Sequence, residues 1–215
     1  MQEYTVIVVY LCIFFCFFSL FLPKEGVVMD KQELLDRLER TPVIAAVQDG
    51  GFAAALASPA EVVFYLKAHI LSVSDRIREA HEAGKAIFVH VELAQGIGHD
   101  QAGLSYLAAA GADGIITTRT QLVRQAREAG LLAVQRFFAL DGQGLLSIDA
   151  ALDGATPDLV EIMPGVIGKV IARFSRGSTP VIAGGLIETK KELTAALESG
   201  AIAVSTGARS LWNID

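Results

Sequence analysis

The chain has 215 residues and a formal net charge of −6, which suits a single domain and lacks the positive field of a general nucleic-acid-binding protein. Any contact with RNA must therefore use a local patch of basic side chains. Hydrophobic residues make up 52% of the chain and the mean hydropathy is +0.45, which is high for a soluble protein.

Much of this excess lies in an apolar prefix, residues 1–28. Its segment Val6–Leu22 has no charged residue, and as a helix it would span about 25 Å, short of a hydrocarbon core of about 30 Å. Glu3, without Lys or Arg, precedes it, unlike the start of a signal peptide. Lys24–Gly26 can be encoded by a purine-rich ribosome-binding sequence. We expect a mis-assigned start, with Met29 as the true first residue; a membrane anchor is the alternative.

Both cysteines, Cys12 and Cys16, lie in this prefix. The remainder, residues 29–215, therefore has no disulfide, cysteine nucleophile or thiolate metal site. Its net charge is −5, because Glu3, Lys24 and Glu25 account for the difference. This composition is compatible with a reducing cytoplasm.

From Met29 onward, apolar strand patterns alternate with helical patterns. Lys31–Arg40 is an amphipathic opening helix. The predicted strands are Val43–Val47, Val62–Leu66, Ala86–Val91, Gly114–Thr117, Leu132–Phe137, Leu159–Ile162, Pro180–Ala183 and Ala201–Ser205. Most are uninterrupted apolar runs, as expected for parallel strands that are buried on both faces.

Four intervening helical patterns end on glycine, a residue favoured just after a helix. These patterns are Ser72–Gly84, Gln101–Gly111, Arg119–Gly130 and Thr189–Gly200. Eight strands alternating with helices predict an α/β fold, a compact TIM-like (β/α)₈ barrel in one domain, residues 29–215. A doubly wound open sheet is the alternative, which the absence of G-x-G-x-x-G after the first strand disfavours.

Two glycine-containing turns near the C-terminus suggest a phosphate site. TPVIAGGLI (Thr179–Ile187) contains Gly184 and Gly185, and AIAVSTGAR (Ala201–Arg209) contains Ser205, Thr206 and Gly207. The loops after the last two strands of such barrels often bind phosphate, and glycine lets the backbone approach an anion closely. The alternative is that these glycines only turn the chain from strand to helix.

Other polar residues fall at the expected carboxyl ends of strands. Asp49, Glu92, Asp141 and Glu161 could bind hydroxyls of a polyol or a metal, or pair through Arg136. His90 and Glu92 leave the same strand face, and a neighbouring carboxylate would raise the pKa of the imidazole for acid–base work. A polar plug of the barrel mouth is the alternative. No tight metal-ligand spacing such as H-x-x-x-H is present.

Basic side chains cluster on three predicted helices, where a solvated surface is the usual reason for such charges. The clusters are Arg119, Arg124 and Arg127; Lys169, Arg173 and Arg176; and Lys190 and Lys191. As nucleic-acid contacts they would engage phosphates without specifying bases.

The sequence resembles the glycerol-3-phosphate-responsive antiterminators of bacterial glycerol operons. The stretches that carry the resemblance are PVIAAVQD (Pro42–Asp49), ASPAEVVFYL (Ala57–Leu66), GKAIFVHVELAQGIGHDQAGLSYL (Gly84–Leu107), DGIITTRTQLVRQAREAGLLAVQRFFALD (Asp113–Asp141), PDLVEIMPG (Pro157–Gly165), PVIAGGLI and VSTGARSLW (Val204–Trp212). Together they cover nearly all of Thr41–Trp212 in one order.

The resemblance implies a non-catalytic cytoplasmic regulator on a TIM-like barrel. With its effector glycerol 3-phosphate bound, such a protein is expected to act on the leader mRNA of a glycerol operon. It prevents termination of transcription there and stabilises the transcript. Carried over to this chain, IAGG and STG would hold the phosphate, and Asp49, Glu92 and Glu161 would be candidates for the glycerol hydroxyls. Lys169 could face ligand or RNA, as could Arg136 and Arg173.

The expected partners are therefore glycerol 3-phosphate and leader mRNA, with no catalytic residue, metal or further cofactor. A membrane contact depends on translation of the prefix, and a homo-oligomer is compatible with the sequence. The alternative function is a barrel enzyme, of isomerase or synthase type, acting on a small phosphorylated substrate. Glu92, Glu161 or His90 would then serve as acid or base.

Overall fold

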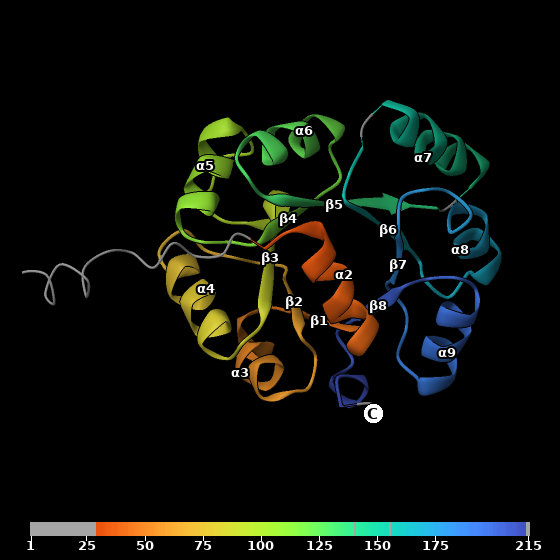
Figure 1. Ribbon diagram of the computed structural model, residues 1–215, viewed down its shortest axis with the longest axis horizontal. Helices are drawn as coiled ribbons and strands as arrows, with labels where there is room; N and C mark the ends of the chain where they lie inside the picture. The colour runs from red at the N-terminus through yellow and green to blue at the C-terminus, as the bar shows by residue number, and fades with distance from the viewer. Residues whose placement is uncertain (1–28, 140, 155, 214–215) are drawn as a thin grey trace, which may run out of the picture.

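Eight parallel strands close into a barrel in the computed structural model, which describes residues 29–139, 141–154 and 156–213 (Figure 1). Each strand pairs with the next in the chain, and β8 pairs with β1. The strands are β1 (Val43–Val47), β2 (Val62–Tyr65), β3 (Ala86–His90), β4 (Gly114–Thr117), β5 (Leu132–Phe138), β6 (Leu159–Met163), β7 (Val181–Gly184) and β8 (Ala203–Thr206). The predicted single-domain (β/α)₈ barrel is confirmed, and the open sheet is excluded.

Helices surround this barrel and return the chain from one strand to the next (Figure 1). They are α2 (Lys31–Arg40), α3 (Asp49–Ala57), α4 (Val73–Glu82), α5 (Gln101–Ala109), α6 (Thr120–Glu128), α7 (Gly142–Gly154), α8 (Gly168–Phe174) and α9 (Lys190–Glu198), with short 3₁₀ turns η1 (Val91–Leu93) and η2 (Arg209–Leu211). The α2 bounds are those predicted. None of the described helices is both long and apolar enough to cross a bilayer. The prefix, residues 1–28, lies outside the described residues.

Glycine ends four of the helices as predicted. Gly84, Gly111, Gly130 and Gly200 follow α4, α5, α6 and α9 with φ of +74°, +90°, +78° and +101°. A residue with a Cβ would be strained in this left-handed conformation, so the repeated Ala-Gly and Ser-Gly endings have a backbone cause.

Helix α2 closes the amino-terminal end of the barrel. Leu34 and Leu38 on its buried face pack in one cluster with Phe64, Phe88 and other inward-facing strand residues. A second apolar cluster fills the layer between the outer face of the strands and the helices. Because α2 and apolar side chains fill one end, polar chemistry is confined to the opposite end, where the strands finish.

Candidate functional site

A buried ion pair lies inside the barrel near the carboxyl ends of β5 and β6. Arg136 Nε is 2.5 Å from Glu161 Oε2, and Glu161 also accepts a hydrogen bond from Ser205 Oγ on β8. The exposed fraction is 8% for the Arg136 side chain and 0% for Glu161. A carboxylate removed from water requires such partners, since an unpaired buried charge is strongly unfavourable. The pairing of these two residues was one of the predicted alternatives.

Gly184, at the end of β7, packs against this ion pair. A Cβ at this position would collide with the Glu161 carboxylate and lie 2.8 Å from Ser205 Oγ. Glycine is therefore required here because the backbone approaches two buried side chains. From the sequence, we expected glycine here because it lets the backbone approach a phosphate closely. The structure adds a second reason, the close packing of the backbone against Glu161 and Ser205.

A cavity of about 570 Å³ opens beside the ion pair at the carboxyl end of the barrel. It is lined by Ala46, Leu66, Arg136, Glu161, Met163, Gly185, Leu186, Ile187, Glu188, Ser205, Thr206, Gly207 and Ala208. Four of the five residues predicted to hold phosphate are in this lining, and Gly184 lies next to it. Small-molecule sites commonly have volumes of about 300–1,000 Å³.

A hydrogen bond of Thr206 joins the two glycine-containing turns beside the cavity. Thr206 Oγ1 donates to the Ile187 carbonyl at 2.6 Å, and the Ala208 amide donates to Thr206 Oγ1 at 3.0 Å. The Thr206 hydroxyl is thus engaged on both sides, and the Ser205 hydroxyl is engaged with Glu161. These hydroxyls fix the turns, which leaves backbone N–H groups and Arg136 as the groups suited to an anion.

Leu186 lines the cavity although no sequence pattern marked it as a site residue. Its φ is +60°, next to Gly185 at +73°, and its side chain is 67% exposed. Among the described non-glycine residues it alone has a positive φ, a conformation that costs roughly 1–2 kcal/mol. Strained backbone of this kind clusters at ligand sites.

Asp49, a predicted hydroxyl ligand, lies outside this cavity. It is the first residue of α3, and its carboxylate accepts a hydrogen bond from the Tyr65 hydroxyl and lies 3.8 Å from Arg76 Nε. Burial, and then Asp49, raise the pKa of Tyr65 to about 12. Asp49 lines a separate hollow with Lys67 and His69.

Glu92 also lies outside the cavity lining, in η1 after β3. One carboxylate oxygen accepts hydrogen bonds from the Thr117 hydroxyl and from the Thr118 amide at 3.1 Å. The other, Oε2, is 3.4 Å from His90 Nδ1, and both atoms are buried without a hydrogen-bond partner among the described residues.

Glu92 has the expected effect of raising the His90 pKa, but the net shift of this pKa is downward. Burial lowers the pKa of the imidazole, nearby Arg136 lowers it further, and the opposing effects of Glu92 and Glu161 do not compensate. His90 is therefore neutral at neutral pH.

The two α8 candidates lie apart from the cavity. Arg173 donates to Asp149 of α7 at 2.6 Å and lines a different hollow with Leu152 and Phe174. Lys169 is exposed and has no ion-pair partner within the described part of the chain. The described residues also contain no group of three or more His, Cys, Asp or Glu side chains placed to hold a metal ion.

Fold and cavity together define a (β/α)₈ barrel with a small-molecule-sized cavity at the carboxyl ends of its strands. Residues 43–212 match the family described as glycerol-3-phosphate responsive antiterminator. The chain belongs to this family.

Relatives agree with that membership. The chain is 32% identical to the uncharacterized protein YgcP of Escherichia coli (strain K12), over 84% of this chain and 96% of that protein. Its structure is similar to the glycerol uptake operon antiterminator regulatory protein of Listeria monocytogenes, with a TM-score of 0.76 and 28% identity over 89% and 97% of the two chains. It is also similar to a glycerol uptake operon antiterminator-related protein of Thermotoga maritima, with a TM-score of 0.70 and 33% identity over 79% of this chain and 96% of that one.

Proposed function

We propose that this protein is a glycerol-3-phosphate-dependent antiterminator that binds and stabilises the leader mRNA of a glycerol-catabolic operon. Family membership over residues 43–212 carries the proposal, and the cavity beside Arg136 and Glu161 supplies a place for the effector. The protein acts in the cytoplasm as a regulator and catalyses no reaction.

The cavity offers complementary groups for the two ends of glycerol 3-phosphate. The phosphate lies against the turns at Gly185 and Gly207, where backbone N–H groups and the remaining N–H groups of Arg136 can donate to it. Glu161, the one predicted hydroxyl ligand in the lining, faces the glycerol part. Arg136 thus bridges Glu161 and the phosphate.

Effector and RNA must be linked through a change in the protein. Glycerol 3-phosphate increases RNA affinity only if it binds the RNA-competent conformation more tightly, and RNA then increases effector affinity by the same factor. The strained turn at Leu186 and the hydrogen bond from Thr206 to Ile187 are the local features that an effector would reach first.

Transcription in vitro tests the proposed function. Purified RNA polymerase transcribes a template with the operon leader and its terminator, and the fraction of read-through transcripts is measured. We expect read-through to rise when both protein and glycerol 3-phosphate are present, with glycerol plus inorganic phosphate as the control. Equal read-through with and without protein contradicts the proposal.

A barrel enzyme for a small phosphorylated substrate is the second candidate, and one observation favours it. His90 Nδ1 and Glu92 Oε2 are buried and unpartnered among the described residues, as an acid–base pair awaiting substrate would be. Turnover of triose or pentose phosphates that is lost in His90→Gln would support this candidate.

A further inference from the structure

The arginines of α6 differ in their partners from those of α2, α4 and α8. In these three helices each arginine pairs with a carboxylate: Arg37 with Glu33, Arg40 with Glu61, Arg76 with Glu79, Arg78 with Asp75, and Arg173 with Asp149. Outside the α-helices, exposed Arg176 and Arg209 also have no carboxylate partner among the described residues. Arg119, Arg124 and Arg127 are all exposed, and no carboxylate in the described part of the chain lies within 4.0 Å of their guanidinium groups. Their positive charge is therefore available to a partner.

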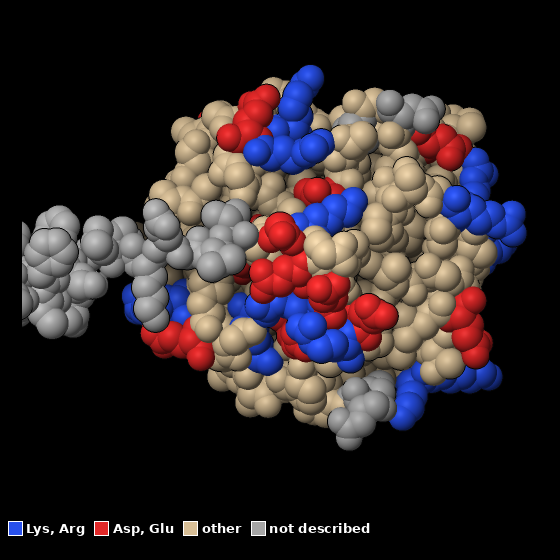
Figure 2. Space-filling model, in the orientation of Figure 1, with Lys and Arg blue, Asp and Glu red and all other residues tan. Residues whose placement is uncertain are grey.

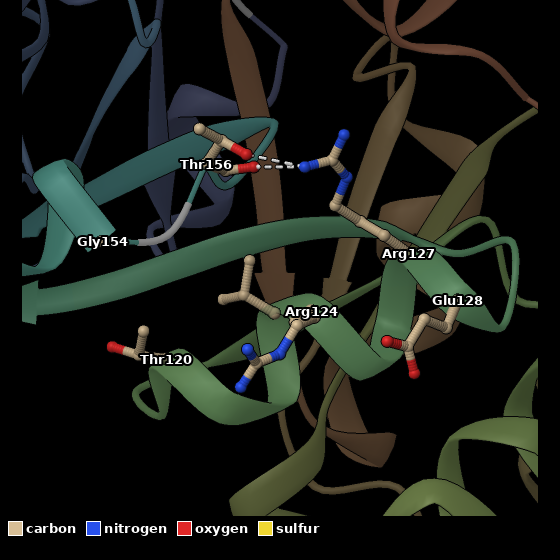
Figure 3. A pocket seen from close by; sticks show the side chains of 7 residues that line it. Thr120, Arg124, Arg127, Glu128, Gly154 and Thr156 are labelled. Atoms are coloured by element: carbon tan, nitrogen blue, oxygen red, sulfur yellow. Dashed lines mark hydrogen bonds between the residues drawn. The ribbon is translucent and has the colours of Figure 1, made fainter.

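Two of these side chains, those of Arg124 and Arg127, border a hollow on the outer surface of the barrel. Thr120, Arg124 and Arg127 are spaced to share one face of α6, and with Gly154 and Thr156 they line a cavity of about 500 Å³. In Figure 3, Arg124 lies beside Thr120 while Arg127 extends to Thr156, donating to its hydroxyl at 2.6 Å and its carbonyl at 3.2 Å. Glu128 also lines this cavity, and within the described part of the chain it forms no ion pair with Arg124.

On the face crossed by α2, unlike at α6, positive and negative side chains pair with each other. Figure 2 shows lysine or arginine and acidic side chains intermixed over α2, as its ion pairs require. Over α6, at the top of the same view, blue side chains gather beside one red patch. A phosphate backbone is attracted to a surface of the second kind, because the positive charge is not already neutralised.

Helix α6 is also tied to the mouth of the barrel. Glu92 binds the Thr117 hydroxyl and the Thr118 amide, and the Arg119 amide donates to the same Thr117 hydroxyl at 3.1 Å. Fully buried Gln135 of β5 donates to Thr120 Oγ1 at 3.0 Å. The first turn of α6 therefore rests on residues at the carboxyl ends of β4 and β5, beside the strands that carry the effector cavity.

We propose that the surface formed by Arg119, Arg124, Arg127 and Thr156, the α6 surface, binds the phosphate backbone of the leader RNA. This inference rests on the proposed function and names its RNA-contact surface. Arginine suits this role because its planar group donates two hydrogen bonds to a phosphate. Such contacts position the RNA and do not read its bases.

The test compares Arg119→Gln/Arg124→Gln with the unchanged chain. Binding to a fluorescent transcript of the operon leader is measured at several salt concentrations in saturating glycerol 3-phosphate. We expect the double variant to bind about tenfold more weakly near 0.1 M salt, and the slope of log affinity against log salt to decrease by about 0.7 for each lost phosphate contact. Calorimetry in the absence of RNA should give unchanged affinity for glycerol 3-phosphate.

Lys190→Gln/Lys191→Gln on α9 is the matched control, because it removes the same charge from two exposed lysines on another helix. It should leave affinity and slope close to those of the unchanged chain. Equal losses in both double variants, or an unchanged slope in the α6 variant, would overturn the α6 surface while keeping RNA binding. If the unchanged chain fails to bind the transcript with or without effector, the proposed function fails and the α6 surface with it.

Discussion

Arg136 and Glu161 face each other inside the barrel, with Arg136 Nε 2.5 Å from Glu161 Oε2 and both side chains buried. Both residues line the cavity, and Glu161 is the more deeply buried of the two. Glu161 therefore holds the guanidinium in place beside the cavity, where, in the proposed function, its remaining N–H groups donate to the phosphate of the effector.

Glu161→Gln should be strongly destabilising. The substitution leaves the Arg136 charge buried without its counter-ion, and breaking a buried pair in this way costs roughly 3–5 kcal/mol. Urea unfolding of the variant measures this free energy. Glu188→Gln, which alters an exposed carboxylate of the same cavity, should change it by less than about 0.5 kcal/mol. Similar values for the two variants would contradict the pairing.

Gly184→Ala should lower stability by about 1–3 kcal/mol, because the added methyl group meets Ser205 Oγ at 2.8 Å and the Glu161 carboxylate. Gly50→Ala is the control, since a Cβ there has no neighbour within 4 Å and the position is helical. That control should be neutral or stabilising. Thermal unfolding distinguishes the two, and a Gly184→Ala variant as stable as the unchanged chain would argue against the close packing.

Leu186→Gly should be nearly neutral, although a large apolar side chain is removed. The side chain is exposed, and glycine relieves a left-handed backbone that costs roughly 1–2 kcal/mol in leucine. Ile187→Gly, at the buried neighbouring residue, should cost more than about 3 kcal/mol. Urea unfolding measures both. A large loss for Leu186→Gly would show that its side chain carries contacts beyond those of an exposed residue.

His90 and His81 should give the stability of the protein opposite pH dependences. Burial lowers the His90 pKa, so the unfolded chain binds its proton first, and stability decreases as pH falls below about 6.5. Asp113 accepts a hydrogen bond from His81 and raises the pKa of the imidazole. The contact therefore stabilises the folded protein fully below about pH 6.5, and this stabilisation is lost as the pH rises through the pKa of His81 in the folded state.

Unfolding of His90→Gln and His81→Gln between pH 5 and 8 separates these effects. The destabilisation caused by His90→Gln should shrink as pH falls, and that caused by His81→Gln should grow. The groups that face His90 are Glu92, Arg136 and Glu161, and each retains its partner in the variant. Parallel pH profiles for the two variants would contradict the assignment.

The sequence predicted the strands well because parallel strands buried on both faces are continuous apolar runs, such as Val43–Val47 and Gly114–Thr117, whose bounds match. Helices α3 and α7 were not predicted. Glycine has a low helix propensity, and glycines occupy positions 50 and 51 of α3 and positions 142 and 144 of α7. In α3, the burial of Phe52 and Ala55 outweighs this low propensity.

The site was less predictable than the fold. The order of the strands places the turns at Gly185 and Gly207 beside one cavity, and sequence reasoning could reach that point. It could not tell that the Asp49 carboxylate binds the outward-facing Tyr65, or that Leu186 adopts a left-handed backbone. The first depends on a contact between residues of two different elements, and the second depends on strain imposed by the surrounding turn.

The most direct test of the account is binding of residues 29–215 to a fluorescent transcript of the operon leader, titrated with and without glycerol 3-phosphate. We predict tight binding only when the effector is present, and a reciprocal gain in effector affinity when the transcript is present. Equal affinity for the transcript in both conditions would contradict the effector-dependent switch. No binding in either condition, with the barrel shown to be folded, would contradict RNA regulation and favour the enzyme.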